Sequence, residues 1–373
     1  MADYYLPEYP CISDMWDELA QEGRPVMVYG MGNGADKLFS RLEKYGVKVA
    51  EVFASDGFVR GHSYRGYRVK SFSEIKSKYD DFVIVLSFGT NREEVLDMLA
   101  EIDREHDMYV PDMPVAGEEE YFDRAFYNEH YEEILEAYES LSDDHSRNVF
   151  SLVLRYKLLG RMKFLEKASD SSADIYALLP RCNISNVIDG GAYNGDTLRE
   201  MREYFPNLRS AIAVEPDVRT FKRLLKYASN VTDFDINIYN AALWSSIGDG
   251  DFSSSANRNS TVSATASYEH RTTSIPLVTV DSLVTSSVDY IKYDVEGAEA
   301  EALFGSAETI KKYSPALRIA IYHRSRDIFA IINYMKQSFD GYSFHIRRTR
   351  CLPAWEIDLI MIPRRIEYDN QTP

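Results

Sequence analysis

The chain has 373 residues, of which 45% are hydrophobic and 27% charged, and its formal net charge is -17. This balance is that of a globular protein long enough to bury two cores. The acidic excess would repel nucleic acid and anionic lipid over most of the surface, and no apolar run approaches the roughly 20 residues of a membrane span. We therefore expect a cytoplasmic protein without nucleic-acid or membrane partners, which binds small molecules or glycans.

The cysteines and the first residues agree with that expectation. Cys11, Cys182 and Cys351 lie far apart and lack the spacing of metal ligands, which is typical of reduced structural cysteines. The amino-terminal run MADYYLPEYP has no basic segment followed by an apolar one, so it does not resemble a secretory signal. Residues 1–23 predict an arm and a short helix, Ser13–Gln21, with Ser13 as its N-cap.

A first domain is expected over residues 24–114. Apolar runs at residues 25–29, 47–53 and 82–87 predict buried strands, and helices are expected over residues 36–44 and up to about residue 105. Strand and helix alternate in this way in small Rossmann-like α/β units.

The first turn of this domain carries a candidate substrate site. Its run GMGNGA satisfies GxGxxA, and the next strand leads to an acidic residue. The pattern resembles the amino-terminal nucleotide-sugar-binding domains of sugar acyltransferases, which implies that a nucleotide sugar contacts Gly30, Gly32, Asn33 and Asp56. Because an isolated GxGxxA is a weak signal, the alternative is an empty unit that serves packing or the formation of a homodimer.

Residues 115–180 predict a helical connector. Apolar and aromatic residues recur there at spacings of three and four, for example at Ile134, Leu135 and Tyr138. We expect this connector to cover the mouth of the active site in the second domain.

The second domain, residues 181–373, is organised around Val187–Pro216. A short apolar run ends in Asp189 and is followed by glycines, so a buried strand leads into a turn where the backbone could approach a ligand closely. A second strand ends in Glu215, 24 positions after Gly191 (215 minus 191). In a doubly wound sheet such a carboxylate lies beside the glycine turn and can accept the two hydroxyls of a ribose. The stretch therefore predicts a nucleoside site.

The sequence of the turn favours one kind of nucleoside. DGGAYNGDT does not match the GxGxxG turn that binds a pyrophosphate, and Asp189 and Asp196 would repel one. Both carboxylates suit S-adenosylmethionine, which carries a sulfonium and an ammonium group. The alternative is a glycine turn that only joins a strand to a helix. The candidate donor-binding residues are Asp189, Gly190, Gly191, Tyr193, Asn194, Glu215, Pro216, Asn240, Ala241 and Asp294, with Asn240 expected at the base edge.

The rest of the second domain predicts a mixed sheet. Residues 245–274 are rich in Ser, Thr, Asn and Gly and are expected to form a long mobile loop. Further along, residues 299–312 and 327–337 predict helices and residues 316–322 a strand. Residues 342–347 and 355–362 are strands without a helix between them, so they must pair antiparallel at the edge of an otherwise parallel sheet.

The run VTVDSL followed by DYIKYDVEGAEAEALFGSAETI resembles the hallmark of FkbM family methyltransferases. The resemblance covers roughly residues 186–364 and includes DGGAYNGDT, VEP, NAAL and IDLIMIP. Small departures are Tyr293 and the pair Ser306 and Ala307. It implies a class I methyltransferase fold with a seven-stranded α/β sheet, S-adenosylmethionine as donor, and transfer usually to an oxygen of a sugar or polyketide.

Methyl transfer to a hydroxyl needs a base that removes its proton. Lys292, Asp294 and Glu296 alternate along one strand and therefore share a face where it leaves the sheet. We expect Asp294 or His323 as the general base, Lys292 to stabilise the oxyanion, and Glu296 to bind substrate. Asp294, Glu296 and His323 could instead ligate a divalent metal, which the spacing does not demand.

Two other charged groups have simpler interpretations. Glu299 and Glu301 are expected to be charges at a helix amino terminus, where they favour the macrodipole. The arginines of the carboxy-terminal region form the main basic concentration of the chain, interpreted as solvated surface or as a dock for a phosphate-bearing substrate; they are Arg347, Arg348, Arg350, Arg364 and Arg365.

The sequence thus predicts an S-adenosylmethionine-dependent methyltransferase that methylates a hydroxyl of a sugar, glycan or related small metabolite. The alternative function is a sugar-nucleotide-binding or scaffold protein whose methyltransferase domain is weakly active. A third possible function is a nicotinamide oxidoreductase that uses the turn at residues 30–35. The sequence shows no evident set of catalytic residues for that reaction.

Overall fold

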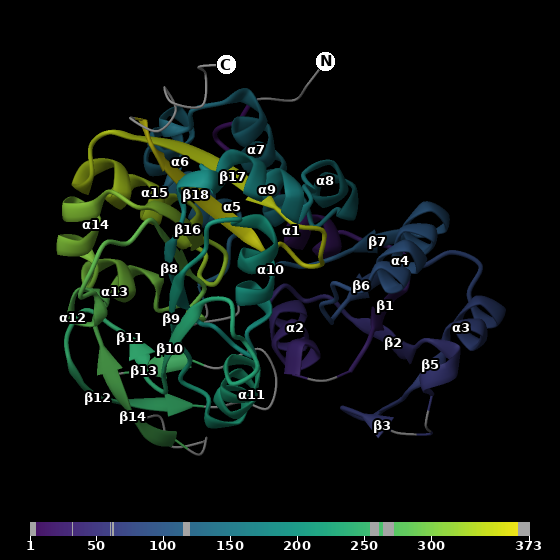
Figure 1. Cartoon of the computed structure of the whole chain (residues 1–373). Coiled ribbons are helices and arrows are strands. Elements are labelled where there is room, and N and C mark those ends of the chain that lie inside the picture. Colours follow the sequence, from purple (N-terminus) through teal and green to yellow (C-terminus); the bar gives the residue numbers. More distant parts are fainter. Residues whose placement is uncertain are drawn as a thin grey trace.

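The computed structural model describes residues 5–31, 33–59, 61, 63–114, 120–253, 261–263 and 272–364. Two α/β domains lie side by side, joined by a group of helices (Figure 1). Within the described residues, no helix combines the length and the apolar composition needed to cross a membrane.

The amino-terminal domain is built on a five-stranded sheet of order β5-β2-β1-β6-β7 in which all neighbours are parallel. In chain order this is 3-2-1-4-5, which is one half of a doubly wound sheet continued by two strands, so the predicted alternation of strand and helix is confirmed. The strands are β1 (Val26–Tyr29), β2 (Val49–Ala54), β5 (Lys70–Ser71), β6 (Val83–Leu86) and β7 (Asp107–Tyr109), and the helices are α2 (Asn33–Lys44), α3 (Phe72–Lys78) and α4 (Glu93–Glu105).

The amino-terminal arm packs against the connector rather than extending freely. The hydroxyl of Tyr127 donates to the carbonyl of Pro7 at 2.8 Å, and Tyr9 stacks on Tyr131. Helix α1 spans Met15–Ala20, and the expected N-cap, Ser13, is wrong: Asp14 caps the helix. Its carboxylate can accept the free N–H groups of the first turn more strongly than a hydroxyl one residue too early.

The connector helices cover the edge of the carboxy-terminal sheet, and among the described connector residues only Ser172 also lines the cavity between the domains, so the expected cover over the active-site mouth stays a prediction. The N–H of Ser142 donates to Phe344 and the N–H of Ile346 to Ser146 Oγ, while Asp143 Oδ2 lies 2.5 Å from His345 Nδ1. An edge strand presents unpaired backbone groups, and these contacts satisfy several of them. The connector comprises α5 (Arg124–Glu129), α6 (Tyr131–Ser140), α7 (Asp144–Leu159), α8 (Met162–Lys167) and α9 (Ser172–Leu178).

The carboxy-terminal domain has a seven-stranded sheet of order β10-β9-β8-β15-β16-β18-β17. Only β18 runs antiparallel to its neighbours, as the predicted strand pair requires. The parallel strands end at one edge, where the donor site was expected. The strands are β8 (Asn186–Gly190), β9 (Ser210–Val214), β10 (Asp235–Tyr239), β15 (Tyr290–Tyr293), β16 (Ala316–Ala320), β17 (Tyr342–Arg348) and β18 (Ile357–Pro363).

The helices of this domain follow the predicted segments with one break. Residues 299–312 form two helices instead of one because Gly305 is pressed against the backbone: a Cβ there would lie 2.1 Å from the carbonyl oxygen of Trp244. The helices that flank the sheet are α10 (Asp196–Tyr204), α11 (Val218–Ala228), α12 (Val280–Leu283), α13 (Glu299–Phe304), α14 (Ala307–Tyr313) and α15 (Asp327–Ser338).

The expected long loop at residues 245–274 is in part a small sheet. Its described residues contribute β12 (Gly248–Ser253), β13 (Thr261–Ser263) and the start of β14 (Thr272–Val278), which join β11 (Ala242–Leu243) in the order β11-β14-β12-β13. Antiparallel pairing of β12 with β14 buries Phe252 and Ile275. Residues 254–260 and 264–271 of the expected loop lie outside the described residues.

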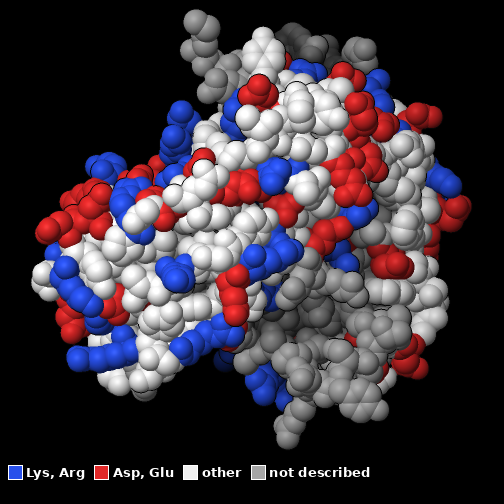
Figure 2. Space-filling view, turned by 180° about the vertical axis from the view of Figure 1, so that it is seen from behind, with Lys and Arg blue, Asp and Glu red and all other residues white. Residues whose placement is uncertain are grey.

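The expected concentration of basic surface is wrong for Arg347 and Arg348. Arg348 is fully buried and donates to the carbonyls of Leu165 and Cys351, and Arg347 is 8% exposed. Figure 2 shows Lys and Arg scattered among Asp and Glu over one face of the molecule. Arg347 and Arg348 therefore serve packing, whereas Arg350 lines the cavity and Arg364 is exposed. Arg365 lies outside the described residues.

The two domains meet where the loop after β6 touches the loop between β17 and β18. Thr90 and Leu352 exchange two backbone hydrogen bonds of 2.8 Å, and Arg350 pairs with Glu93 and with Asp97. Gly89 lies beneath Trp355, since a Cβ on it would come within 2.5 Å of the indole ring. One cluster of buried side chains runs through both domains and the connector, so the interface is part of the core.

Replacement of Arg348 with Met should lower the free energy of unfolding by about 3 kcal/mol, because it leaves buried carbonyls without a charged donor. Urea denaturation measures the loss. The control is Arg104→Met on α4, where the side chain is 74% exposed and the change should stay within about 0.5 kcal/mol. Equal losses in the two variants would contradict a structural role for Arg348.

Candidate active site

A cavity of about 1210 Å³ lies at the carboxyl ends of β8, β9 and β15 and extends to the loops of the amino-terminal domain. Residues from both domains line it, which the sequence did not indicate. From the carboxy-terminal domain these are Gly191, Tyr193, Glu215, Pro216, Ala241 and Asp294, and from the amino-terminal domain Met31, Gly34, Phe88, Asn91 and Arg92.

The glycines of the turn after β8 are needed for packing, which differs from the expected reason. Gly191 has φ +76°, and a Cβ there would lie 1.8 Å from the carbonyl oxygen of Asp294; Gly195 has φ +83° and lies against the ring of Tyr227. The turn thus sits directly on the end of β15. Close approach of the turn to the chain after β15 favours glycine here, and Gly191 also lines the cavity, so close approach to a ligand stays a prediction.

Glu215 holds the ends of two strands together and lines the cavity. Its carboxylate accepts hydrogen bonds from the N–H of Tyr193, the N–H of Asp217 and the hydroxyl of Thr220, each at 2.8 Å. Three of its roughly four acceptor positions are therefore used, and one is left for a ribose hydroxyl instead of the expected two. Burial favours the neutral acid and raises the pKa of Glu215 to about 7.

The other donor candidates divide into two groups. Tyr193, Pro216 and Ala241 line the cavity, whereas Asn194 and Asn240 do not. The amide nitrogen of Asn240 donates to the carbonyls of Glu215 and Pro216, at 2.8 and 3.0 Å, so this side chain fixes the rim of the site. The expected role of Asn240 at the edge of the nucleoside base stays a prediction. Only its amide oxygen takes no part in these two hydrogen bonds.

Lys292 joins the ends of β8 and β15. Its ammonium lies 3.3 Å from Asp294 Oδ2 and 3.7 Å from Asp189 Oδ1. Asp189 is fully buried, neither of its oxygens accepts a hydrogen bond from the described residues, and burial raises its pKa to about 6. Burial alone would lower the pKa of Lys292, but the two carboxylates raise it, so the ammonium stays charged.

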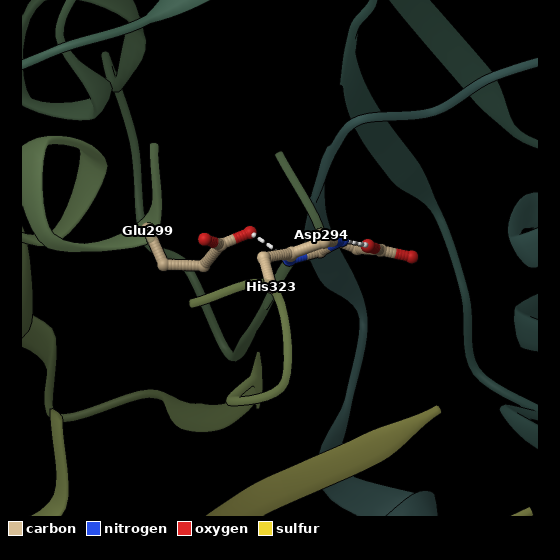
Figure 3. Close-up of side chains that lie close together, drawn as sticks. All are labelled: Asp294, Glu299 and His323. Carbon is tan, nitrogen blue, oxygen red and sulfur yellow. Dashed lines mark ion pairs between the residues drawn. The ribbon is translucent and has the colours of Figure 1, made fainter. Parts of the chain in front are cut away.

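His323 lies behind Asp294, away from the cavity. The imidazole is 1% exposed, and its Nε2 is 3.6 Å from Asp294 Oδ1 and 3.5 Å from Glu296 Oε2. Figure 3 shows the ring between Asp294 and Glu299, whose Oε1 is 2.9 Å from Nδ1 at an angle that makes no hydrogen bond. The structure therefore brings Lys292, Asp294, Glu296 and His323 together, as predicted.

Glu299 lies at a helix amino terminus, as expected, but it is also buried and accepts a hydrogen bond there. It is 1% exposed, and its Oε1 accepts the N–H of Val295 at 2.9 Å. The carboxylates outweigh the effect of burial and raise the pKa of His323 to about 10, with Glu299 the strongest of them. For Asp294, Lys292 and then His323 overcome burial and lower the pKa.

The amino-terminal candidates are less suited to a ligand. Gly30 has φ +110°, and a Cβ there would lie 2.7 Å from the ring of Phe88, so the protein itself fills the space beside this glycine. Asp56 accepts the N–H and the hydroxyl of Ser73 at the start of α3. Gly32 and the side chain of Asn33 lie outside the described part of the structure. Nucleotide-sugar binding at this turn stays a prediction.

Sequence reasoning missed Tyr322, Trp355 and Glu356. The hydroxyl of Tyr322 lies 3.4 Å from Asp294 Oδ1, and all three residues line the cavity. Tyr322 comes directly before His323, a position that could have been noted. No local pattern marks Trp355 or Glu356, which reach the site because the loop between β17 and β18 folds over it.

Residues 189–344 match the family model described as the Methyltransferase FkbM domain, which supports a methyltransferase. No curated protein matches the chain.

The fold is similar to that of methyltransferase FkbM from Methylobacillus flagellatus KT, with a TM-score of 0.68, 17% identity, and 91% of this chain and 90% of that chain covered. A putative methyltransferase from Streptococcus mutans in complex with SAH gives a TM-score of 0.33, 10% identity and coverage of 52% and 97%. Aeropyrum pernix fibrillarin with natively bound S-adenosyl-L-methionine gives a TM-score of 0.33 and 13% identity, with 51% of this chain and 74% of that chain covered. The first similarity extends over both domains.

Gly191→Ala should destabilise the chain more than Gly341→Ala. Both glycines have similar positive φ values, +76° and +81°, but only Gly191 faces the backbone, while nothing lies within 4 Å of a Cβ at Gly341. The strain of φ costs about 1 kcal/mol at either site, and the clash should add about 2 kcal/mol at Gly191. Urea denaturation compares the two; equal losses would mean that the turn does not rest on Asp294.

Proposed function

We propose that the chain is an S-adenosylmethionine-dependent O-methyltransferase that methylates a hydroxyl of a sugar, glycan or related small metabolite. The observation that carries this proposal is the shared cavity, in which the acidic ends of β8, β9 and β15 face an opening between the domains. Binding the donor and the acceptor in one cavity would align the hydroxyl with the methyl group, which supplies much of the acceleration of such a displacement.

The charges at the strand ends support a cationic donor. Asp189 is fully buried and pairs with Lys292 at 3.7 Å, while neither of its oxygens accepts a hydrogen bond from the described residues. Asp294, on the other side of Lys292, lines the cavity. The negative charge of these carboxylates would favour the ammonium of the methionine part of the donor. Glu215 would accept one ribose hydroxyl through its remaining acceptor position, and Pro216 and Ala241 offer apolar contact for the base.

The cavity between the domains supports a hydroxylated acceptor. Trp355 and Glu356 line it together with Phe88 and Asn91. The indole N–H of Trp355 is buried and has no acceptor among the described residues, so an acceptor oxygen could bind it. A wall of one aromatic face with nearby carboxylate and amide groups suits a polyhydroxylated ring better than a purely apolar one.

Asp294 is our candidate for the base that takes the proton of the hydroxyl. It lines the cavity, and its lowered pKa keeps it ionised at neutral pH. Because His323 does not line the cavity, it is a positioning residue that acts through Asp294. Lys292 lies on the other side of the same carboxylate and fixes its orientation. Asp294 can then accept a proton without changing its place.

Calorimetry with S-adenosylhomocysteine tests the donor site. We expect micromolar binding whose affinity rises several-fold from pH 5.5 to 8. The pKa of Glu215 is about 7, so the side chain loses its proton over this range, and only the ionised carboxylate can accept hydrogen bonds at all of its lone pairs. Glu215→Gln should weaken binding about tenfold, the value of one good hydrogen bond, and should flatten the rise near pH 7.

The control is Glu203→Gln on the exposed side of α10, which should bind and titrate as the wild type does. Absence of binding at millimolar ligand, or an unchanged pH profile in Glu215→Gln, would contradict the assignment of the donor site.

Mass spectrometry after incubation with S-adenosylmethionine and a panel of sugars, oligosaccharides and nucleotide sugars tests the acceptor. Products should gain one methyl group on a hydroxyl. Asp294→Asn should lower kcat by about 10²-fold or more, because general base catalysis has that size, while S-adenosylhomocysteine still binds. Full turnover by this variant would remove Asp294 from the mechanism, and methylation of nitrogen or carbon alone would contradict O-methylation.

A further inference from the structure

Helix α11 carries an unusual charge for an acidic chain. Its sequence, VRTFKRLLKYA, contains four basic residues and no acidic one, whereas the whole chain has a formal net charge of -17. The four side chains are exposed, and none of them forms an ion pair within the described part of the chain. They are Arg219, Lys222, Arg223 and Lys226.

The positions of these charges are unfavourable for the helix itself. Arg219 and Arg223 are four residues apart, as are Lys222 and Lys226, and like charges at this spacing repel each other. Arg219 also lies in the first turn, where the helix macrodipole favours negative charge. Both effects destabilise α11 in the free chain, and a bound anion would relieve them.

Two of these side chains line an open pocket of about 370 Å³ between α10 and α11, beside the cavity of the active site. Among the described residues, no carboxylate lines this pocket. The acidic residues of α10 lie elsewhere: Asp196 and Glu200 line the cavity, and Glu203 lines neither. The pocket is lined by three cations, two carboxamides and one phenol ring, from Asn194, Arg199, Arg223, Lys226, Tyr227 and Asn230.

Arg199 is held in place on one side of this pocket. Its guanidinium donates to the amide oxygen of Asn194 at 2.8 Å and lies over the ring of Tyr227, 4.8 Å from the ring centre. The carboxylate of Asp233 also acts on Tyr227, but it pairs with Arg202 at 2.7 Å, so it leaves the charge of the pocket uncompensated. A guanidinium that is already oriented loses little freedom when it binds the oxygens of a phosphate.

We propose that Arg199, Arg223 and Lys226 bind a phosphate group in the pocket between α10 and α11. Three cationic donors suit a doubly charged anion, and guanidinium groups match the oxygens of phosphate in geometry. Two molecules can supply this group: a phosphorylated acceptor that extends from the cavity, or a separate phosphate ion. Phosphate binding does not depend on methyl transfer.

Arg223 connects the pocket to the active site, because it lines the cavity as well. The consequence for the reaction rests on the proposed function: the hydroxylated acceptor would be a phosphorylated sugar, whose phosphate reaches the pocket along α11. The donor has no phosphate, so it makes no use of these cations.

Calorimetry of the full-length protein with inorganic phosphate tests the pocket. We expect one ion bound per chain in the millimolar range or tighter, with an affinity that falls as NaCl is added, because salt screens exposed charges. Arg223→Gln and Arg199→Gln should each weaken binding about tenfold or more, the value of one charge-assisted hydrogen bond. Lys222→Gln removes the same charge from α11 outside the pocket, so its affinity should stay within about twofold of the wild type.

Circular dichroism shows whether each variant is folded. Lys226→Gln changes a side chain without an ion pair among the described residues, so it replaces Arg199→Gln if that variant does not fold. No binding at tens of millimolar phosphate by the wild type would overturn the proposal, as would unchanged binding by folded Arg223→Gln and Lys226→Gln.

The same measurement with glucose 1-phosphate, UDP-glucose and glucose distinguishes the two sources of the phosphate group. Binding of a phosphorylated sugar that is tighter than that of inorganic phosphate and is weakened in Arg223→Gln assigns the group to the acceptor, and equal affinities assign it to a separate ion. Calorimetry with S-adenosylhomocysteine in phosphate-free buffer separates this proposal from the proposed function: donor binding without phosphate binding removes the pocket and leaves the methyltransferase assignment intact.

Discussion

The site depends on the burial of one ammonium group, that of Lys292, between two carboxylates at the ends of neighbouring strands. Lys292 lies 3.7 Å from Asp189 on β8 and 3.3 Å from Asp294, which follows β15. A buried charge without a partner costs several kcal/mol, so these strand ends must stay together for the fold to be stable. Gly191, directly after β8, packs against the carbonyl of Asp294 and so brings the same two strand ends together. The floor of the cavity and the position of its reactive carboxylate follow from this pairing.

The amino-terminal domain completes the cavity rather than forming a separate module. Its loop after β6 bonds to the loop between β17 and β18 through Thr90 and Leu352, and Gly89 supports the indole of Trp355. A change in the contacts of that loop would therefore move the wall of the acceptor site without touching the donor site. Under the proposed function, this arrangement would give the domain a role in acceptor recognition even if its own glycine turn, against which Phe88 packs, binds nothing.

Much of the fold and of the donor site could be predicted because parallel strands carry local signals. Each apolar run ends where a strand ends, so Asp189, Glu215 and Asp294 could be placed at one edge of the sheet from spacing alone. Contacts between distant segments had no such signal. The burial of Arg348 by the connector, the break at Gly305 against Trp244, and the approach of Glu299 to His323 depend on packing that no local pattern encodes.

The most direct test is a crystal structure of the chain with S-adenosylhomocysteine. The account predicts the nucleoside at the ends of β8 and β9, with a ribose hydroxyl bonded to Glu215 and the amino acid part directed toward Asp189. A ligand bound elsewhere, or a crevice that stays empty at saturating ligand with Glu215 engaged only by Tyr193, Asp217 and Thr220, would contradict it.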